Sequence, residues 1–411
     1  MGTACPARLR AVSQWAWTCR RGRICTLLLG EESGGTTWTT GRQAERAEFL
    51  TDRTILITGA TGFVGGAFAS SMAFGADRIV VHIRANTIAG ARERLYRSIS
   101  RFLPLGDAYK AVEQSAILLG DLAVEGDLEH PALDAVTHVV HAAACTSFAS
   151  TREVWRSNVD ATARLLERVR RAPRLERFLH VGTAYCCGDR PARVVCEGDS
   201  PSLAHTYVNE YTRSKAEAER LVLVAATDLP VLVVRPSAIV GHSTLGVGPS
   251  SSLFWYYRAL AALGAGPFNV GAYRDVVPVD YVADAIGFLL RLERPKFLSY
   301  HVSAGERGRT LWIDILRAFV GATDWRTVSP TELGGMRDAI RTLVRTDEEA
   351  KALARGLVAC GEFGRLGVDH FDNERLMGEG FRAPPPFTDY LPRCIESAGA
   401  ATVYEQMVDE A

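Results

Sequence analysis

Residues 54–66, TILITGATGFVGG, contain a short apolar run followed at once by closely spaced glycines. The run has the β-branched composition of a buried strand, and Phe63–Phe74 after it has the apolar spacing of a helix. Backbone N–H groups at the start of a helix form an anion site. In that setting Gly59 makes the turn, Gly62 lets a pyrophosphate approach, and Gly65 lets the helix pack on the strand. The stretch therefore predicts a dinucleotide-binding turn, and the alternative is a tight turn that only needs small residues.

From residue 53 onward, short β-branched runs alternate with longer helical patterns such as Val154–Val169 and Tyr211–Ala225. Alternation of this length is typical of right-handed βαβ units around a parallel sheet. The predicted fold class is α/β, a Rossmann-like doubly wound parallel sheet with a smaller mixed α/β substrate lobe towards the C-terminus. The predicted strands are Thr54–Thr58, Arg78–Ile83, Ala116–Leu119, Thr137–His141, Arg177–Val181 and Val231–Arg235.

The pattern divides the chain into three parts. Residues 1–50 show no periodicity and have arginines but no acid before Glu31, so we expect a disordered leader or a transit peptide. Residues 51–240 carry the alternation of strands and helices and are predicted to form an NADP-binding Rossmann domain. Gly- and Pro-rich loops follow Pro236, so residues 241–411 are predicted to form the C-terminal substrate lobe, with 275–303 returning to the first domain.

Composition excludes some classes of protein. The 411 residues include 47 basic and 47 acidic side chains, so no overall field attracts nucleic acid or an anionic membrane. No apolar run approaches the roughly 20 residues that cross a bilayer, and no secretory signal is recognisable. The nine cysteines lack CxxC or Cys/His spacing, so no metal is expected. The predicted location is cytoplasmic.

The second predicted strand indicates which dinucleotide binds. An NAD site usually has an Asp or Glu about 20 residues after the glycines, which bonds the ribose 2′-hydroxyl. Here the strand ends in Arg84, and no acid occurs between Asp77 and Glu93. A guanidinium at that point can hold a 2′-phosphate, and Arg92 or Arg94 can add a second contact. The sequence thus predicts NADP(H), and the alternative is that these arginines are solvated helix charges.

Tyr211 and Lys215 lie four residues apart at the start of a helical pattern, on one face of the helix. An ammonium close to the phenol is expected to lower the tyrosine pKa from about 10 towards the working pH. Tyr211 is then a candidate general acid toward a carbonyl that receives a hydride. Thr183, in HVGTAYCCG (180–188), closes a strand and puts a hydroxyl where ligands bind in such sheets. Taken singly, each residue also has a structural interpretation.

These motifs together resemble the extended short-chain dehydrogenase/reductase superfamily, in order and spacing, over roughly residues 53–300. Within the superfamily, IRANTIAGARERL (83–95) resembles a segment of thioester reductases and of fatty acyl-CoA reductases of the male sterility type. The matching segments are TGATGFVG (58–65), GDL (120–122), HAAA (141–144), Asn158, GTAY (182–185), YTRSK (211–215) and RPSAIVG (235–241).

The resemblance implies a role for each matching position. Thr183, Tyr211 and Lys215 would be catalytic, with Asn158 supporting a proton relay. The pyrophosphate of the cofactor would lie along the glycine turn, and two arginines would bind the 2′-phosphate. Residues that come after other strands would flank the adenine and the nicotinamide. The cofactor-binding residues implied are Gly59, Thr61, Gly62, Phe63, Val64, Gly65, Arg84, Arg94, Asp121, Leu122, Ala142, Ala143, Ala144, Tyr211, Lys215, Pro236, Ser237 and Ile239.

Two positions depart from the thioester reductases. Gly182 precedes Thr183 where these enzymes usually have Ser-Thr, and Ala216 stands where they often have a bulky aromatic residue. Both changes are more like sugar-nucleotide epimerases or steroid dehydrogenases. They leave the hydride chemistry unchanged and weaken the inference of a thioester substrate.

The predicted function is NADPH-dependent reduction of an acyl thioester, carried by coenzyme A or a carrier protein, to an aldehyde or, after a second reduction, to an alcohol. The first alternative is an epimerase, dehydratase or hydroxysteroid-type dehydrogenase acting on a sugar nucleotide or alcohol. The second is a non-catalytic NADP-binding regulatory protein. Nucleic acid and an integral membrane segment are not expected, and the sequence does not predict the oligomeric state.

Other features have structural interpretations. His138, His141 and His180 are expected to be hydrogen-bonded core residues, and the arginines between 168 and 177 a solvated helix end. The aromatic run Phe254–Tyr257 either walls an acyl pocket or joins the lobes.

Overall fold

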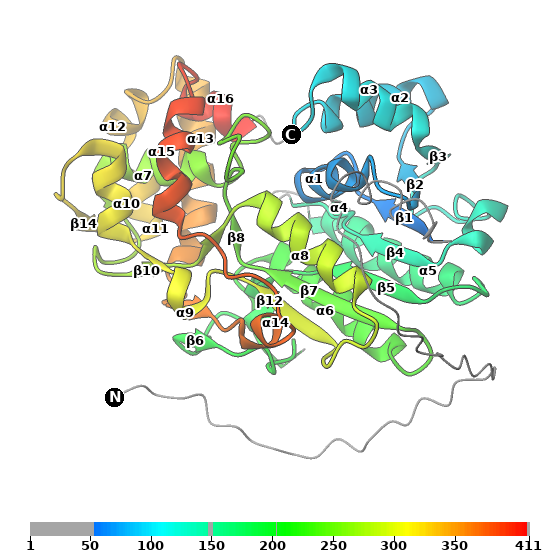
Figure 1. Ribbon diagram of the computed structural model, residues 1–411. Coiled ribbons are helices and arrows are strands. Elements are labelled where there is room, and N and C mark those ends of the chain that lie inside the picture. Colours follow the sequence, from blue (N-terminus) through cyan, green and yellow to red (C-terminus); the bar gives the residue numbers. More distant parts are fainter. Residues whose placement is uncertain (1–52, 147–150, 203, 409–411) are drawn as a thin grey trace, which may run out of the picture. The chain divides into compact units, whose positions relative to one another are not determined.

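The computed structural model describes residues 53–146, 151–202 and 204–408, so the predicted leader, residues 1–50, lies outside the described residues. Within the described ranges, seven parallel strands form one sheet in the order β12-β7-β5-β4-β1-β2-β3 (Figure 1). The predicted Rossmann-like sheet is confirmed, and the six predicted strands differ from the observed ones by at most one residue at an end. The strands are β1 (Thr54–Thr58), β2 (Arg78–Ile83), β3 (Ala116–Leu119), β4 (His138–His141), β5 (Arg177–Val181), β7 (Val231–Pro236) and β12 (Ser299–Val302).

Helices cover both faces of this sheet because its strands carry apolar side chains on both sides. The helices on one face are α1 (Phe63–Met72), α2 (Ile88–Ile99), α3 (Leu105–Gln114) and α8 (Val279–Arg291). Those on the other face are α5 (Ala161–Val169) and α6 (Glu210–Ala225).

The strand order reverses beside β1, which lies between β2 and β4. Ile57 of β1 is in register with Val81 on one side and Val140 on the other. Ligands of open α/β sheets bind in the crevice at such a reversal, outside the carboxyl ends of the strands. The glycine turn follows β1 directly, so it lies at this crevice.

Many residues of the predicted C-terminal lobe, residues 241–411, pack in a second apolar core. Phe254–Tyr257 are at most 5% exposed and belong to this core, so packing inside the lobe, rather than a pocket wall, accounts for the aromatic run. The main core helices of the lobe are α7 (Phe254–Leu263), α10 (Trp312–Val320), α13 (Asp347–Gly364) and α15 (Phe387–Ser397). In Figure 1 these helices group together, apart from the sheet.

Short elements complete the described part. The paired strands are β6 (Val194–Val195) with β15 (His370–Phe371), β8 (Ala238–Ile239) with β11 (Val276–Val277), β9 (Ala265–Gly266) with β14 (Arg326–Thr327), and β10 (Tyr273–Arg274) with β13 (Thr310–Leu311). The short helices are α9 (Gly305–Gly308), α11 (Pro330–Gly334), α12 (Arg337–Arg341), α14 (Glu374–Gly378) and α16 (Val403–Val408), with 3-10 turns η1 (Pro131–Ala135) and η3 (Ala184–Cys187).

One predicted helix is interrupted. The sequence predicts a single helix over Val154–Val169, whereas the structure has α4 (Thr151–Trp155), a π-helical turn η2 (Arg156–Asp160) and then α5. A π turn is a local widening of a continuous helix. The apolar spacing of the segment does not reveal it.

Two arginines of the 168–177 run are not a solvated helix end. Arg168 is 5% exposed and donates to the carbonyl of Leu128, 3.0 Å away. Arg177 Nη1 donates to the carbonyls of Leu289 and Leu290, at 2.8 and 3.2 Å. The last carbonyls of a helix need donors from elsewhere. For α8 this donor comes from a strand more than 100 residues away in the sequence.

Candidate active site

The turn between β1 and α1 has a shape that depends on two glycines. Gly59 has φ +76°, in the left-handed region, and a Cβ there would lie 2.5 Å from the Ala143 nitrogen. A Cβ on Gly65 would lie 2.1 Å from the Gly59 oxygen. Gly62, at the start of α1, makes no side-chain cap. Because a Cβ on Gly59 or Gly65 would clash with backbone atoms, the turn keeps this shape only with glycine at both. This cradle fits the pyrophosphate of a dinucleotide at the helix start.

The residues predicted to lie along the cofactor border this turn. The N–H of Ala142 donates to the Thr58 carbonyl at 3.2 Å, which brings the segment after β4 against the turn. Leu122 is 7% exposed and packs in the core, so of the predicted adenine pair only Asp121 presents a partly accessible side chain. The other predicted residues here are half-buried or exposed: Thr61, Phe63, Val64, Ala142, Ala143 and Ala144.

Arg84 and Arg94 meet just beyond β2. Arg94 Nη1 donates to the Arg84 carbonyl. The Arg84 side chain is 61% exposed, and its Nη1 lies 3.3 Å from Glu153 Oε1 and 3.9 Å from Asp121 Oδ2. Arg92 turns away and pairs with Glu113 of α3. A 2′-phosphate at Arg84 would therefore compete with two carboxylates, and Arg92 is not placed to help.

The predicted catalytic residues converge at the carboxyl end of β5. Thr183 is 7% exposed, and its Oγ1 accepts from the Tyr185 N–H at 3.3 Å. Lys215, on α6, is 4% exposed and donates from Nζ to the Val181 carbonyl at 2.7 Å. Tyr211 lies one turn before Lys215 on the same helix. The ammonium thus reaches from α6 to a residue two positions before Thr183.

The predicted lowering of the Tyr211 pKa is wrong. Burial, together with the nearby thiols of Cys186 and Cys145, raises the pKa of Tyr211 to about 12. Lys215 is not among the groups that shift the Tyr211 pKa, and its ammonium is bonded to the Val181 carbonyl. Burial also lowers the pKa of Lys215 to about 8. Tyr211 therefore holds its proton at neutral pH.

Asn158 connects the segment after β4 to α6, the helix that carries the predicted catalytic residues Tyr211 and Lys215. It lies in η2 and is 1% exposed. Its side chain accepts from the Cys145 N–H at 2.7 Å and donates to Ser214 Oγ at 2.9 Å. Ser214 Oγ in turn donates to the Tyr211 carbonyl at 2.7 Å. Asn158 is therefore linked to α6 through the hydroxyl of Ser214.

Sequence reasoning missed a hydrogen-bond chain behind Asn158. His141 bridges Thr58 Oγ1 at 2.7 Å and Thr162 Oγ1 at 2.9 Å. Thr162 Oγ1 donates to the Asn158 carbonyl at 2.6 Å. Burial lowers the pKa of His141 to about 3, so the ring is neutral and can donate at one nitrogen and accept at the other. The position of His141 at the end of a strand is the one signal that could have suggested this chain.

The three strand histidines differ. His138 and His141 are hydrogen-bonded core residues, as predicted. His180 is 1% exposed, and neither of its ring nitrogens has a hydrogen-bond partner within the described ranges. The prediction is therefore wrong for His180. Its ring packs against that of His141, with the centroids 5.4 Å apart.

The remaining predicted cofactor residues lie where β7 leaves the sheet. Pro236 ends β7, and the Ser237 N–H donates to the Val302 carbonyl at 3.1 Å. Both side chains are buried, and Ile239 of β8 is half-buried. Pro236 is thus on the strand next to β5, whereas Ser237 and Ile239 follow it outside the large sheet.

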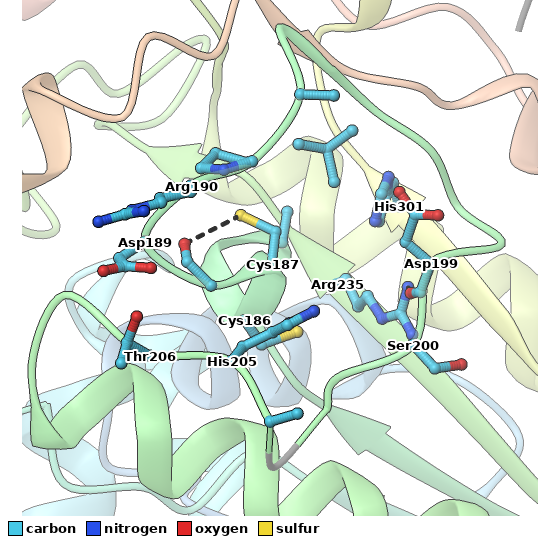
Figure 2. A pocket seen from close by; sticks show the side chains of 16 residues that line it. Cys186, Cys187, Asp189, Arg190, Asp199, Ser200, His205, Thr206, Arg235 and His301 are labelled. Atoms are coloured by element: carbon cyan, nitrogen blue, oxygen red, sulfur yellow. Dashed lines mark hydrogen bonds between the residues drawn. The ribbon is translucent and has the colours of Figure 1, made fainter.

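A pocket of about 490 Å³ opens beside this loop (Figure 2). Its lining includes Cys186, Cys187, Asp199, His205, Arg235 and His301. Acyl chains need apolar walls, and much of this lining is polar or charged. We therefore do not assign the acyl chain to this pocket.

The sequence matches a known family model. The model, described as male sterility protein, covers residues 57–286, which is more than half of the 411 residues. The chain belongs to the male sterility protein family.

The sequence is also similar to two vertebrate enzymes. Fatty acyl-CoA reductase 2 of Homo sapiens is 27% identical over 316 residues, which cover 65% of this chain and 60% of the relative. Fatty acyl-CoA reductase 1 of Xenopus laevis is 26% identical over 346 residues, with coverages of 72% and 64%. The chain thus spans less than two thirds of the length of these curated relatives.

Solved structures share the fold of this chain. The terminal R domain from the myxalamid PKS-NRPS biosynthetic pathway has a TM-score of 0.69 at 20% identity, covering 84% of this chain and 90% of that domain. The Bordetella bronchiseptica enzyme WbmG in complex with NAD has a TM-score of 0.58 at 21% identity, covering 88% and 98%. At such identities the likeness concerns the fold.

The comparisons also correct the predicted location. The prediction of a cytoplasmic protein rests on the lack of a long apolar run and of a secretory signal. Neither feature identifies the compartment in which a protein is found. The similarity to fatty acyl-CoA reductase 2 of human and mouse contradicts it. In the described ranges, no helix combines the length and the apolar character needed to cross a membrane.

Proposed function

We propose that this protein reduces an acyl thioester with NADPH, and that the acyl group arrives on coenzyme A or on a carrier protein. The observation that carries the proposal is that Lys215 bonds to the carbonyl of Val181, two residues before Thr183, while Tyr211 lies one turn before Lys215 on α6. The glycine turn lies at the same edge of the sheet, because β1 and β5 are parallel to the strand between them. The names of the relatives support the substrate class, since they are fatty acyl-CoA reductases. The first product is an aldehyde, which a second reduction converts to an alcohol.

The nicotinamide dinucleotide supplies the hydride when it is bound. The glycine turn would hold its pyrophosphate, and Arg84 with Arg94 its 2′-phosphate. The cofactor class is supported by the family and by the shared fold of WbmG, whose structure is a complex with NAD. The preference for NADPH rests on Arg84 and on the absence of an acid at the end of β2.

The residues of the chain would act on the carbonyl oxygen. Thr183 Oγ1 and the Tyr211 hydroxyl would donate hydrogen bonds to the negative charge that develops there. Preorganised donors of this kind are worth roughly 2.7–4 kcal/mol. The phenol, with a pKa of about 12, keeps the proton that the oxygen then receives. Lys215 would orient the cofactor ribose and hold positive charge next to the site. Cleavage of the carbon–sulfur bond then releases the thiol.

A second candidate is hydride exchange with an alcohol of a sugar nucleotide or sterol. The observation that favours it is the close packing around Gly182, where a Cβ would lie 3.1 Å from Glu219 Oε2. A serine at this position, usual in thioester reductases, would therefore crowd a buried carboxylate.

The decisive assay follows NADPH absorbance with a series of acyl-CoA thioesters and measures free thiol in parallel. We expect NADPH loss with stoichiometric thiol release for the first reduction. Binding of NADPH without consumption of any acyl-CoA or carrier-bound thioester would contradict the proposal, and sugar nucleotides and sterols would then be tested.

Arg84→Ala is expected to weaken NADPH binding by roughly 10- to 100-fold and to leave NADH binding nearly unchanged. The reason is the loss of charge-assisted hydrogen bonds to the 2′-phosphate, worth roughly 1.5–3 kcal/mol. Fluorescence titration of both cofactors measures the effect. The control is Arg97→Ala, because Arg97 pairs with Glu93 at 3.0 Å on the surface of α2. An equal loss of NADH and NADPH binding would count against a 2′-phosphate contact.

A further inference from the structure

A buried carboxylate continues the catalytic face of α6. Tyr211, Lys215 and Glu219 follow one another at intervals of four residues and therefore lie on one side of the helix. Glu219 is fully buried, with 0% of its surface exposed. Its Oε1 accepts from Arg235 at 2.9 and 2.6 Å, so the charge is paired inside the protein.

The second oxygen of Glu219 faces the loop that carries Thr183. Cys186 Sγ lies 3.5 Å from Oε2 as a weak donor. A Cβ on Gly182 would lie 3.1 Å from the same oxygen. The carboxylate therefore touches the loop on both sides of Thr183, and the absence of a side chain at residue 182 makes room for it.

Arg235 extends the connection to β7. It precedes Pro236, where the strand leaves the sheet, and donates from Nη1 to the Asp199 carbonyl at 2.8 Å. The Glu219–Arg235 pair thus joins the catalytic helix, the Thr183 loop and the end of β7. Buried pairs of this kind contribute little net stability compared with apolar residues, and some are retained for specificity.

Glu219 also acts on the charge of Lys215. Burial lowers the pKa of Lys215, and attraction to Glu219 opposes that change. The other groups that face Lys215 are neutral at pH 7. Burial lowers the pKa of His141 on β4 and of His180 on β5, so both rings are uncharged. Burial raises the pKa of the Cys186 thiol far above its usual range, so this thiol keeps its proton.

We propose that Glu219 is a positioning residue that keeps Lys215 protonated and holds the Thr183 loop against α6. The inference rests on the proposed function, because it takes Lys215 as the residue that orients the cofactor. Glu219 itself does not contact the reacting atoms in this assignment.

The test is the pH dependence of Glu219→Gln. In the wild type we expect activity and NADPH affinity to fall as the pH rises through about 8, the pKa of Lys215. In the variant the ammonium loses its counter-charge, so this alkaline limb should move to lower pH by about one unit. Both kcat/KM and the NADPH dissociation constant are measured from about pH 6 to about pH 9, a range that extends to both sides of the Lys215 pKa.

The matched control is Glu217→Gln. Glu217 lies on the same helix and pairs with Arg220 at 2.7 Å, so the substitution removes the same charge on a more exposed face. Its alkaline limb should coincide with that of the wild type. If Glu219→Gln fails to fold, Glu219→Gln combined with Arg235→Met removes both buried charges. Its alkaline limb should move in the same direction but by less, because the repulsion of Lys215 by Arg235 is removed as well.

The outcomes separate the two proposals. A shift confined to the Glu219 variants supports the assignment. Coinciding profiles for all variants, or equal shifts in the Glu217 and Glu219 variants, overturn it. The NADPH binding profile gives this answer even when no thioester is consumed, so failure of the substrate proposal is recognised separately, by intact binding without turnover.

Discussion

Tyr211→Phe is expected to lower kcat for thioester reduction by roughly 10²- to 10⁴-fold, the usual contribution of a positioned general acid. The substitution removes one hydroxyl and leaves the ring in place, so the packing of α6 is kept. Binding of NADPH should change little, because the pyrophosphate cradle is formed by the turn after β1 and not by α6. The measurement is the initial rate of NADPH loss at saturating acyl-CoA, with the NADPH dissociation constant determined on the same sample.

The control for this variant is Tyr109→Phe. Tyr109 is 61% exposed on α3, and removal of its hydroxyl should leave the rate unchanged. A Tyr211→Phe enzyme that turns over near the wild-type rate would show that another group donates the proton.

Gly65→Ala is expected to abolish measurable NADPH binding and to lower the free energy of unfolding by about 3 kcal/mol. The added methyl group would lie 2.1 Å from the Gly59 oxygen, which belongs to the backbone and has no rotamer to change. Helix α1 would have to move away from β1, and the cradle at its start would open. Thermal unfolding and a fluorescence titration with NADPH measure the two effects.

Gly106→Ala is the matched control. No atom lies within 4 Å of a Cβ at this position in α3. Alanine is also the better helix former, so stability should stay equal or rise slightly, with unchanged cofactor binding. Normal NADPH affinity in Gly65→Ala would mean that the cofactor does not rest on this turn.

Six of the seven strands of the sheet could be predicted from the sequence because they are nearly continuous apolar, β-branched runs, a pattern set by burial on both faces. The strand β12, SYHV, has no such run and is not among the predicted strands. The position of β1 and the glycine turn follow from one stretch, residues 54–66. The order of the motifs was enough to identify the family. These features all depend on local composition and on spacing along the chain.

The electrostatics of the site could not be predicted, because they depend on distant contacts. The spacing of Tyr211 and Lys215 is informative about the helix face, but it does not show that the ammonium bonds to the Val181 carbonyl. The same limit applies to Glu219, whose partner Arg235 lies on a strand 16 residues away. The unbonded ring of His180 is likewise a product of packing between strands, as far as the described ranges show.

The π-helical turn at Arg156–Asp160 has a consequence for any attempt to transplant this site. Asn158 reaches Cys145 and Ser214 from the middle of that turn, so its direction depends on the number of residues in the segment as well as on its own side chain. A scaffold with a regular helix of the same composition would present an asparagine rotated away from both partners. Copying the site therefore requires copying the irregular length of residues 151–169, which a comparison of side chains alone would overlook.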